Sequence, residues 1–146
     1  MPPIHPGDGI LLSVRNNLTA LPSLQERVRD FLQRRAVPSE VIYNVCLAVE
    51  EILTNTIKFG YPDTLPHEIA VDLTLAPGEV ILVIADDARA FDPQTAPKPD
   101  LTLSVEQRPI GGLGLHLVRS LSGRMTYRRQ NDKNILEVRF RHGVAE

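Results

Sequence analysis

The stretch from Ser39 to Tyr61 constrains the fold of this 146-residue chain more than any other part of the sequence. Its apolar residues recur every three or four positions, which is the spacing of one face of an α-helix. The apolar stripe is broad, so this helix is predicted to be largely buried and the other elements to form a frame around it. The stripe consists of Val41, Ile42, Val45, Ala48, Val49, Ile52 and Leu53.

Two polar residues on this helix form a candidate functional pair. Glu51 and Asn55 are four positions apart and so lie one turn above the other, and Lys58 extends the same face. A carboxylate can accept a proton or hold a water, and an amide oxygen can ligate a hard cation such as Mg²⁺. The alternative for such a pair, taken alone, is a solvated helix edge.

Composition limits the class of protein. The chain is 42% apolar and 23% charged, as expected of one soluble globular domain spanning residues 1–146. A net charge of −2 includes no basic surplus, so nucleic acid is not an expected partner. No apolar run is long enough to cross a membrane, and the N-terminus has no signal-peptide pattern, so we expect a cytoplasmic protein. Cys46 is the only cysteine, and a buried structural thiol is expected there rather than a nucleophile.

The order of predicted elements indicates an α+β fold with one mixed, mostly antiparallel sheet and helices on one face. Residues 1–9 are rich in Pro and Gly and are expected to be flexible. Residues 88–110 contain four prolines and little periodicity, which is typical of a lid or binding loop. The remaining predictions are strands at 10–14, 69–75, 80–85, 125–129 and 135–140, and helices at 21–35, 39–61 (capped by Ser39) and 113–121.

Two further motifs lie between the predicted strand at 80–85 and the predicted strand at 125–129. Asp86 closes the apolar strand at 80–85, where a carboxylate against an apolar wall can accept a hydrogen bond from an amino group such as that of adenine. Its alternative is an ordinary turn aspartate. The sequence GGLG at 111–114 opens a helix, and its backbone N–H groups can approach phosphate oxygens. Its alternative is a plain turn before a helix.

The order of these motifs resembles the GHKL, or Bergerat-fold, ATPases, which include the histidine kinases. The resemblance covers nearly the whole chain. Within that superfamily the sequence resembles the bacterial anti-sigma-factor serine/threonine kinases. Three segments carry this resemblance, namely VCLAVEEILTNTIKFGYPD, IADDARAFDP and GGLGLHLVRSLSGRMTYRRQNDKNILEVRF.

The resemblance implies catalytic roles for two residues and a metal ligand. Glu51 would be the general base that activates the acceptor hydroxyl. Asn55 would ligate Mg²⁺, with ATP phosphates and water at the other positions, and Lys58 would extend the cofactor-binding face. Arg108 could reach the γ-phosphate, and a solvated lid arginine is the alternative.

The same resemblance implies how ATP would be held. Asp86 would take the adenine amino group. Phe91, together with Leu53 and Ile84, could wall the adenine pocket, and core packing is the alternative for these apolar residues. Ala88 stands where the family has a glycine, which changes how closely the backbone approaches the base. The phosphates would meet the cofactor-binding segment Gly111, Gly112, Leu113, Gly114 and Leu115.

Three functional hypotheses follow. The first is a serine/threonine kinase and anti-sigma factor that phosphorylates a STAS-type anti-anti-sigma protein, with a sigma factor as a second partner. The second is a non-catalytic, ATP-gated binding module, and the third is a simple ATPase or histidine-kinase fragment. A homodimer is expected, and the helix at 21–35 is a candidate dimer or partner surface although most of its apolar stripe must be core.

Overall fold

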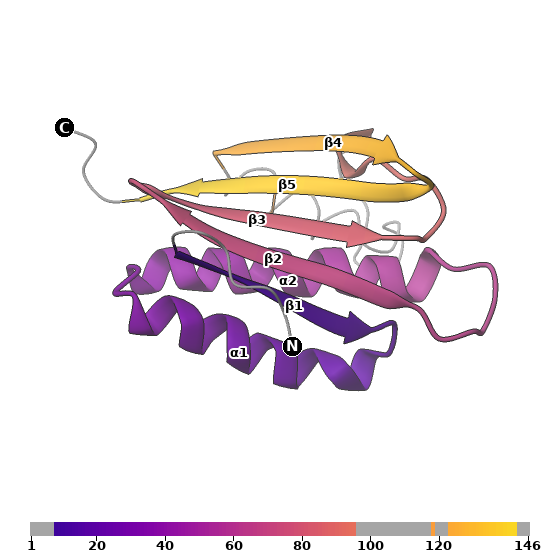
Figure 1. Cartoon of the computed structure of the whole chain (residues 1–146), viewed down its shortest axis with the longest axis horizontal. Helices are drawn as coiled ribbons and strands as arrows, with labels where there is room; N and C mark the ends of the chain where they lie inside the picture. Colours follow the sequence, from indigo (N-terminus) through magenta and orange to yellow (C-terminus); the bar gives the residue numbers. More distant parts are fainter. Residues whose placement is uncertain (1–7, 96–117, 119–122, 143–146) are drawn as a thin grey trace, which may run out of the picture.

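The computed structural model describes residues 8–95, Val118 and residues 123–142. Five strands form one sheet in the order β1-β2-β3-β5-β4, and α1 and α2 lie beside each other on one side of it (Figure 1). Every pairing among these strands is antiparallel. The predicted α+β fold is confirmed, and no parallel pair occurs in the described part of the sheet. The strands are β1 (Asp8–Arg15), β2 (Glu68–Ala76), β3 (Glu79–Asp86), β4 (Arg124–Gln130) and β5 (Lys133–Arg141).

The long helix α2 (Ser39–Phe59) has the predicted buried stripe. Eight of its apolar side chains are buried, and Val45, Ala48, Val49 and Leu53 are sealed from solvent. The predicted cap is wrong, because Pro38 occupies the N-cap position and no side chain caps the helix. The Pro38 carbonyl instead accepts hydrogen bonds from the backbone N–H groups of Val41 and Ile42.

The helix α1 (Leu21–Arg34) begins with a proline in its first turn, where the ring fits a helix without losing a hydrogen bond. Its apolar stripe, Leu21, Leu24, Val28, Phe31 and Leu32, is buried in the core. Its other faces carry exposed charged and polar residues. The apolar stripe of α1 therefore belongs to the core, and only the charged faces remain for contact with a partner.

The strands alternate between a face covered by helices and a face open to solvent. In β3 the side chains of Val80, Leu82 and Ile84 are buried, while those between them are half-buried. β3 is the middle strand of the sheet, as its continuous apolar run predicted. The core therefore lies between the helices and one face of the sheet. The inward residues of the other strands include Leu12, Val14, Ile69, Val71, Leu73, Leu136, Val138 and Phe140.

Turn residues set the strand connections. Gly78 has a φ of +74° in the β2–β3 hairpin, and Asn131 and Asp132 have φ values of 53° and 61° in the β4–β5 hairpin. Two successive residues with positive φ are typical of a tight hairpin turn that suits the twist of the strands. β5 lies between β3 and β4 in the sheet, so β3 and β4 are not neighbours although one follows the other in strand number.

Several predicted segments fall wholly or partly outside the described residues. β1 begins at Asp8, so residues 8 and 9 belong to a strand and residues 1–7 are not described. Of the predicted lid, residues 88–95 are described and end in a short 3₁₀ turn, η2 (Pro93–Thr95). Another short turn, η1 (Leu18–Ala20), precedes α1. In the predicted helix at 113–121 only Val118 is described, and it is helical and buried.

Within the described ranges, no helix combines the length and the apolar character that crossing a membrane requires.

Candidate functional site

Asp86 is a buried carboxylate, with 6% of its surface exposed, at the end of β3. Its Oδ1 accepts hydrogen bonds from the backbone N–H of Ala88 at 3.0 Å and from Nδ2 of Asn134 at 2.8 Å. No described residue donates a hydrogen bond to Oδ2. Burial raises the pKa of Asp86, and the bond from Asn134 opposes that shift. Asp86 is thus a fixed acceptor rather than a solvated turn residue.

The C-terminal end of α2 is fastened to the turn that follows Asp86. The backbone N–H of Arg89 donates to the carbonyl of Gly60 at 2.9 Å. A Cβ added to Gly60 would lie 2.8 Å from the Cβ of Ala88 and 2.5 Å from the carbonyl oxygen of Thr56. The two segments therefore touch without room for a further methyl group. Ala88, which stands where the predicted family has a glycine, is buried at this contact.

This contact brings the candidate residues of α2 to the end of the sheet where Asp86 lies. Asn55 precedes Gly60 by five residues, or roughly 7 Å along the helix axis, and Glu51 lies one turn further back. Both side chains are half-buried, and neither forms a hydrogen bond or ion pair with a described residue. Lys58 is exposed. Glu51 and Asn55 are therefore polar groups without a partner among the described residues, on the helix that meets the Asp86 turn.

A tyrosine that was not predicted as a site residue lies near Asp86 and Asp87. The Tyr61 hydroxyl is buried and close to the Asp87 carboxylate, but it does not reach hydrogen-bond geometry with any described residue. Burial, and then the charges of Asp86 and Asp87, raise the pKa of this hydroxyl. Leaving a buried hydroxyl unpaired costs about 1–3 kcal/mol. Its position therefore fits a site built to give polar groups of a ligand a partner near Asp86.

The Tyr61 ring stacks on His67, with ring centroids 4.4 Å apart. His67 bridges two carboxylates, with Nδ1 3.0 Å from Asp87 Oδ2 and Nε2 2.9 Å from Asp63 Oδ1. The hydrogen bonds to Asp63 and then Asp87 raise the pKa of His67. These contacts connect the loop after α2 to the residue next to Asp86.

The predicted adenine-pocket walls have different surroundings. Leu53 and Ile84 are sealed in the hydrophobic core, so core packing accounts for both. Phe91 is 41% exposed, and its backbone N–H lies 3.4 Å from Asn134 Oδ1. The predicted phosphate-binding residues, Arg108, Gly111, Gly112, Leu113, Gly114 and Leu115, lie outside the described residues.

Protein side chains alone do not build a metal cage in the part of the chain that is described. No group of three or more His, Cys, Asp or Glu side chains there could hold a metal ion. A hard cation at Asn55 would therefore take further oxygen ligands from a phosphate group and water, which suits Mg²⁺ because it keeps several waters.

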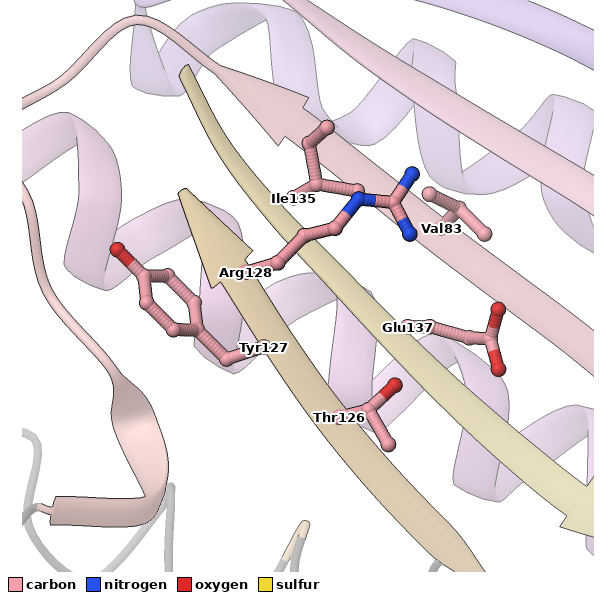
Figure 2. Close-up of a pocket in the computed structure, with 6 residues that line it drawn as sticks. All are labelled: Val83, Thr126, Tyr127, Arg128, Ile135 and Glu137. Atoms are coloured by element: carbon pink, nitrogen blue, oxygen red, sulfur yellow. The ribbon is translucent and has the colours of Figure 1, made fainter. Parts of the chain in front are cut away.

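A hollow of about 230 Å³ lies over β3, β4 and β5 and is separate from these residues. Figure 2 shows Arg128 lying across Ile135 toward Val83, with Glu137 and Thr126 beside it. None of the candidate residues on α2 or at the end of β3 lines this hollow. It is also smaller than most small-molecule sites, which hold roughly 300–1,000 Å³. The hollow is therefore not the candidate nucleotide site.

Sequence reasoning missed three polar residues at the site, namely Asn134, Tyr61 and His67. Asn134 had a signal, because it occupies an inward position in the alternating pattern of β5. Tyr61 and His67 lie in a turn-rich loop, and only tertiary contacts bring them beside Asp86 and Asp87.

A helix with an acid and an amide one turn apart, joined to a buried aspartate at the end of a central strand, is the arrangement that the sequence predicted for a histidine kinase-like ATPase domain. Residues 14–140 match the family description "Histidine kinase-like ATPase domain". The chain belongs to this family, and the resemblance noted in the sequence is confirmed.

Its curated relatives include two named kinases. The chain is 32% identical over 96 residues to the serine/threonine-protein kinase BtrW of Bordetella bronchiseptica, covering 66% of this chain and 68% of BtrW. It is 29% identical over 86 residues to the serine-protein kinase RsbW of Listeria monocytogenes, covering 56% of this chain and 55% of RsbW. The matched part is thus about half of RsbW.

A solved structure supports the fold. The crystal structure of the RsbU and RsbW domains of Rv1364c from Mycobacterium tuberculosis matches with a TM-score of 0.60 and 15% sequence identity. The match covers 90% of this chain and 32% of that chain. At this identity the likeness concerns the fold alone.

Proposed function

We propose that this protein is an ATP-dependent serine/threonine protein kinase that acts as an anti-sigma factor in partner switching. Its substrate would be a STAS-type anti-anti-sigma protein, and a sigma factor would be a second partner. The names of BtrW and RsbW support the kinase assignment. The observation that carries the proposal is the junction of Gly60 with Ala88 and Arg89, which joins the helix of Glu51 and Asn55 to the turn of Asp86.

The described residues fit a nucleotide in three respects. Asp86 has one oxygen held by two donors and the other without a donor from the described residues. The Tyr61 hydroxyl is buried near Asp86 and Asp87 and does not reach hydrogen-bond geometry with a described residue. Glu51 and Asn55 are half-buried on the adjoining helix and form no hydrogen bond or ion pair with a described residue. The site thus offers an acceptor for an amino group and oxygen atoms for a cation and a proton.

Each residue would act through its own polar atoms. Asp86 would accept the amino group of adenine, and Asn55 would hold Mg²⁺ through its amide oxygen. Glu51 would accept the proton of the attacking serine or threonine hydroxyl. Bound ATP would supply the phosphoryl group, and catalysis in this class of reaction comes mainly from positioning and charge stabilisation. Arg108 and the glycine segment at 111–115 remain predictions for the phosphate end.

A phosphoryl-transfer assay tests the proposal. Wild-type protein is incubated with γ-labelled ATP, Mg²⁺ and a STAS-type anti-anti-sigma protein from the same organism. Label should pass to the STAS protein, and Glu51→Gln should reduce the rate by about 100-fold or more because the general base is lost. Glu50→Gln is the matched control, since Glu50 is the exposed neighbour on the same helix.

Two outcomes decide between the hypotheses. A rate that is equal in Glu51→Gln and wild type would remove Glu51 from catalysis. Binding of ATP without any transfer of label would favour the non-catalytic, ATP-gated module instead. Homodimerisation and residence in the cytoplasm complete the proposal, and the dimer is tested by sedimentation of the purified chain.

A further inference from the structure

Asn134 is a buried polar residue with no role in the proposed function so far. It lies at an inward position of β5, directly opposite Asp86 of β3, and is 6% exposed. Its neighbours on the same face of β5 are Leu136 and Val138, which are core residues. A carboxamide at such a position needs hydrogen-bond partners for both of its ends.

The nitrogen of the Asn134 amide faces acceptors only. Nδ2 donates to Asp86 Oδ1 at 2.8 Å and to the carbonyl of Arg89 at 2.9 Å, and the carbonyl of Ala88 lies at 3.4 Å. One side chain thus contacts both the Asp86 carboxylate and the backbone of Ala88 and Arg89, the first two of residues 88–95. The position of the carboxylate is thereby tied to the course of the chain after it.

The oxygen of the same amide faces donors only. Oδ1 accepts from the Tyr127 hydroxyl at 2.6 Å and from Arg129 Nη1 at 3.1 Å, and the Phe91 backbone N–H lies at 3.4 Å. Since acceptors surround one end and donors the other, the orientation of the amide is fixed by its partners. A carboxylate or an apolar group of the same shape cannot satisfy both ends.

We propose that Asn134 is the positioning residue that holds Asp86 and residues 88–91 in place for a purine base whose amino group is at C6. This inference rests on the proposed function. Asn134 and the Ala88 N–H both bind Oδ1 of Asp86, so the carboxylate cannot rotate freely and Oδ2 has no donor among the described residues. A guanine presents a carbonyl oxygen where adenine presents its amino group, so a fixed carboxylate acceptor selects adenine.

The charge of Asp86 depends on the same contact. Burial raises the pKa of this carboxyl, while the hydrogen bond from Asn134 and the charge of Arg129 lower it. Arg129 Nη1 also donates to the Ala88 carbonyl at 2.8 Å. Loss of the Asn134 donor should therefore raise the pKa of Asp86 further and make its strength as an acceptor depend more on pH than in the wild type.

The test compares the affinities of ATP and GTP, with Mg²⁺, for four proteins at pH 6, 7 and 8 by calorimetry. These are wild type, Asn134→Asp, Asp86→Asn and the control Asn131→Asp, which makes the same change at an exposed hairpin residue. Asn134→Asp should lower the preference for ATP over GTP roughly tenfold, because it places a second acceptor against Asp86. Its affinity for ATP should also rise with pH more steeply than that of wild type or Asn131→Asp, because the ionised Asp86 carboxylate is the better acceptor for an amino group.

The outcomes separate this inference from the proposed function. If wild type binds ATP with no preference over GTP, or does not bind it, the proposed function fails and the inference fails with it. If Asp86→Asn loses the preference while Asn134→Asp only melts earlier and keeps it, Asn134 is a structural residue and the inference alone is overturned. Should Asn134→Asp not fold, Asn134→Leu, which is close in size and uncharged, is judged by the same change in preference.

Discussion

At the scale of single residues, Asp86 is a charge in a place where burial disfavours it. Its pKa is raised mainly by loss of solvent, and Asn134 and the Ala88 N–H compensate only in part. When folding raises the pKa of an acid, the free energy of unfolding of the protein falls as the pH rises above the pKa of that acid in the unfolded chain, which is near 3.9 for Asp. The unliganded protein is thus less stable at neutral pH than an uncharged side chain would make it.

Asp86→Asn should therefore raise the free energy of unfolding of the unliganded protein, by on the order of 1 kcal/mol at pH 7. The Asn oxygen can still accept both hydrogen bonds that reach Oδ1 in the wild type. Urea denaturation measures the change, and Asp132→Asn at the exposed β4–β5 turn is the control. A loss of stability in Asp86→Asn would contradict the view that function keeps the charge there.

At the scale of elements, the end of α2 and the turn after β3 form one unit. Gly60 has a φ of −85°, which any residue adopts, so the need for glycine there is steric and not conformational. Its added Cβ would meet Ala88 and the Thr56 carbonyl at less than 3.0 Å. Gly60 and Ala88 thus pack directly against each other.

Gly60→Ala should destabilise the protein by about 1–3 kcal/mol, because the new methyl has to push the two segments apart. Gly123→Ala is the matched control, since a Cβ there would meet its nearest atoms at 3.4 Å, an ordinary contact. Chemical denaturation measures both. Equal stability of the two variants would mean that α2 and the Asp86 turn are not in tight contact.

The loop between α2 and β2 contains a histidine, His67, that lies between two carboxylates. His67 needs both ring nitrogens to act as donors toward Asp63 and Asp87, so its contacts favour the charged imidazolium. Its folded pKa is raised above the unfolded value of about 6.5. The stabilisation is therefore complete below about pH 6.5 and is lost as the pH rises through the folded pKa.

The difference in unfolding free energy between wild type and His67→Gln should thus shrink as the pH increases from 5.5 toward 8.5. Denaturation series at several pH values test this. His142→Gln is the control, because the His142 side chain has no hydrogen-bond partner among the described residues. A difference that stays constant over this range would show that His67 does not titrate between its two carboxylates.

At the scale of the whole molecule, local patterns were sufficient for most of the fold. Alternation in residues 69–75 and 135–140 predicted strands with one buried face, and the stripe of α2 predicted its burial. The run at 80–85 predicted a central strand, but an apolar run does not reveal that Ile81 and Val83 face the open side of the sheet. That depends on which faces the helices cover.

The candidate site was only partly predictable for a physical reason. Glu51, Asn55 and Asp86 have local signals, namely helical spacing and a position at a strand end. The roles of Asn134 and His67 arise from contacts across 48 and 20 positions of sequence, which no local pattern contains. Sequence reasoning therefore identified the residues that would contact a ligand, such as Asp86. It did not identify the residues that hold these in position, such as Asn134.

The central claim is that α2 and the Asp86 turn together bind ATP with Mg²⁺. The most direct test is the thermal unfolding of wild type, Asn55→Ala and Asn44→Ala with and without ATP and Mg²⁺. Asn44 is the matched control, because it lies on the same helix about three turns before Asn55. At 100 times the dissociation constant, ATP with Mg²⁺ should stabilise wild type and Asn44→Ala by about 2.7 kcal/mol and Asn55→Ala far less. No stabilisation of wild type at millimolar ATP with Mg²⁺ would contradict the account.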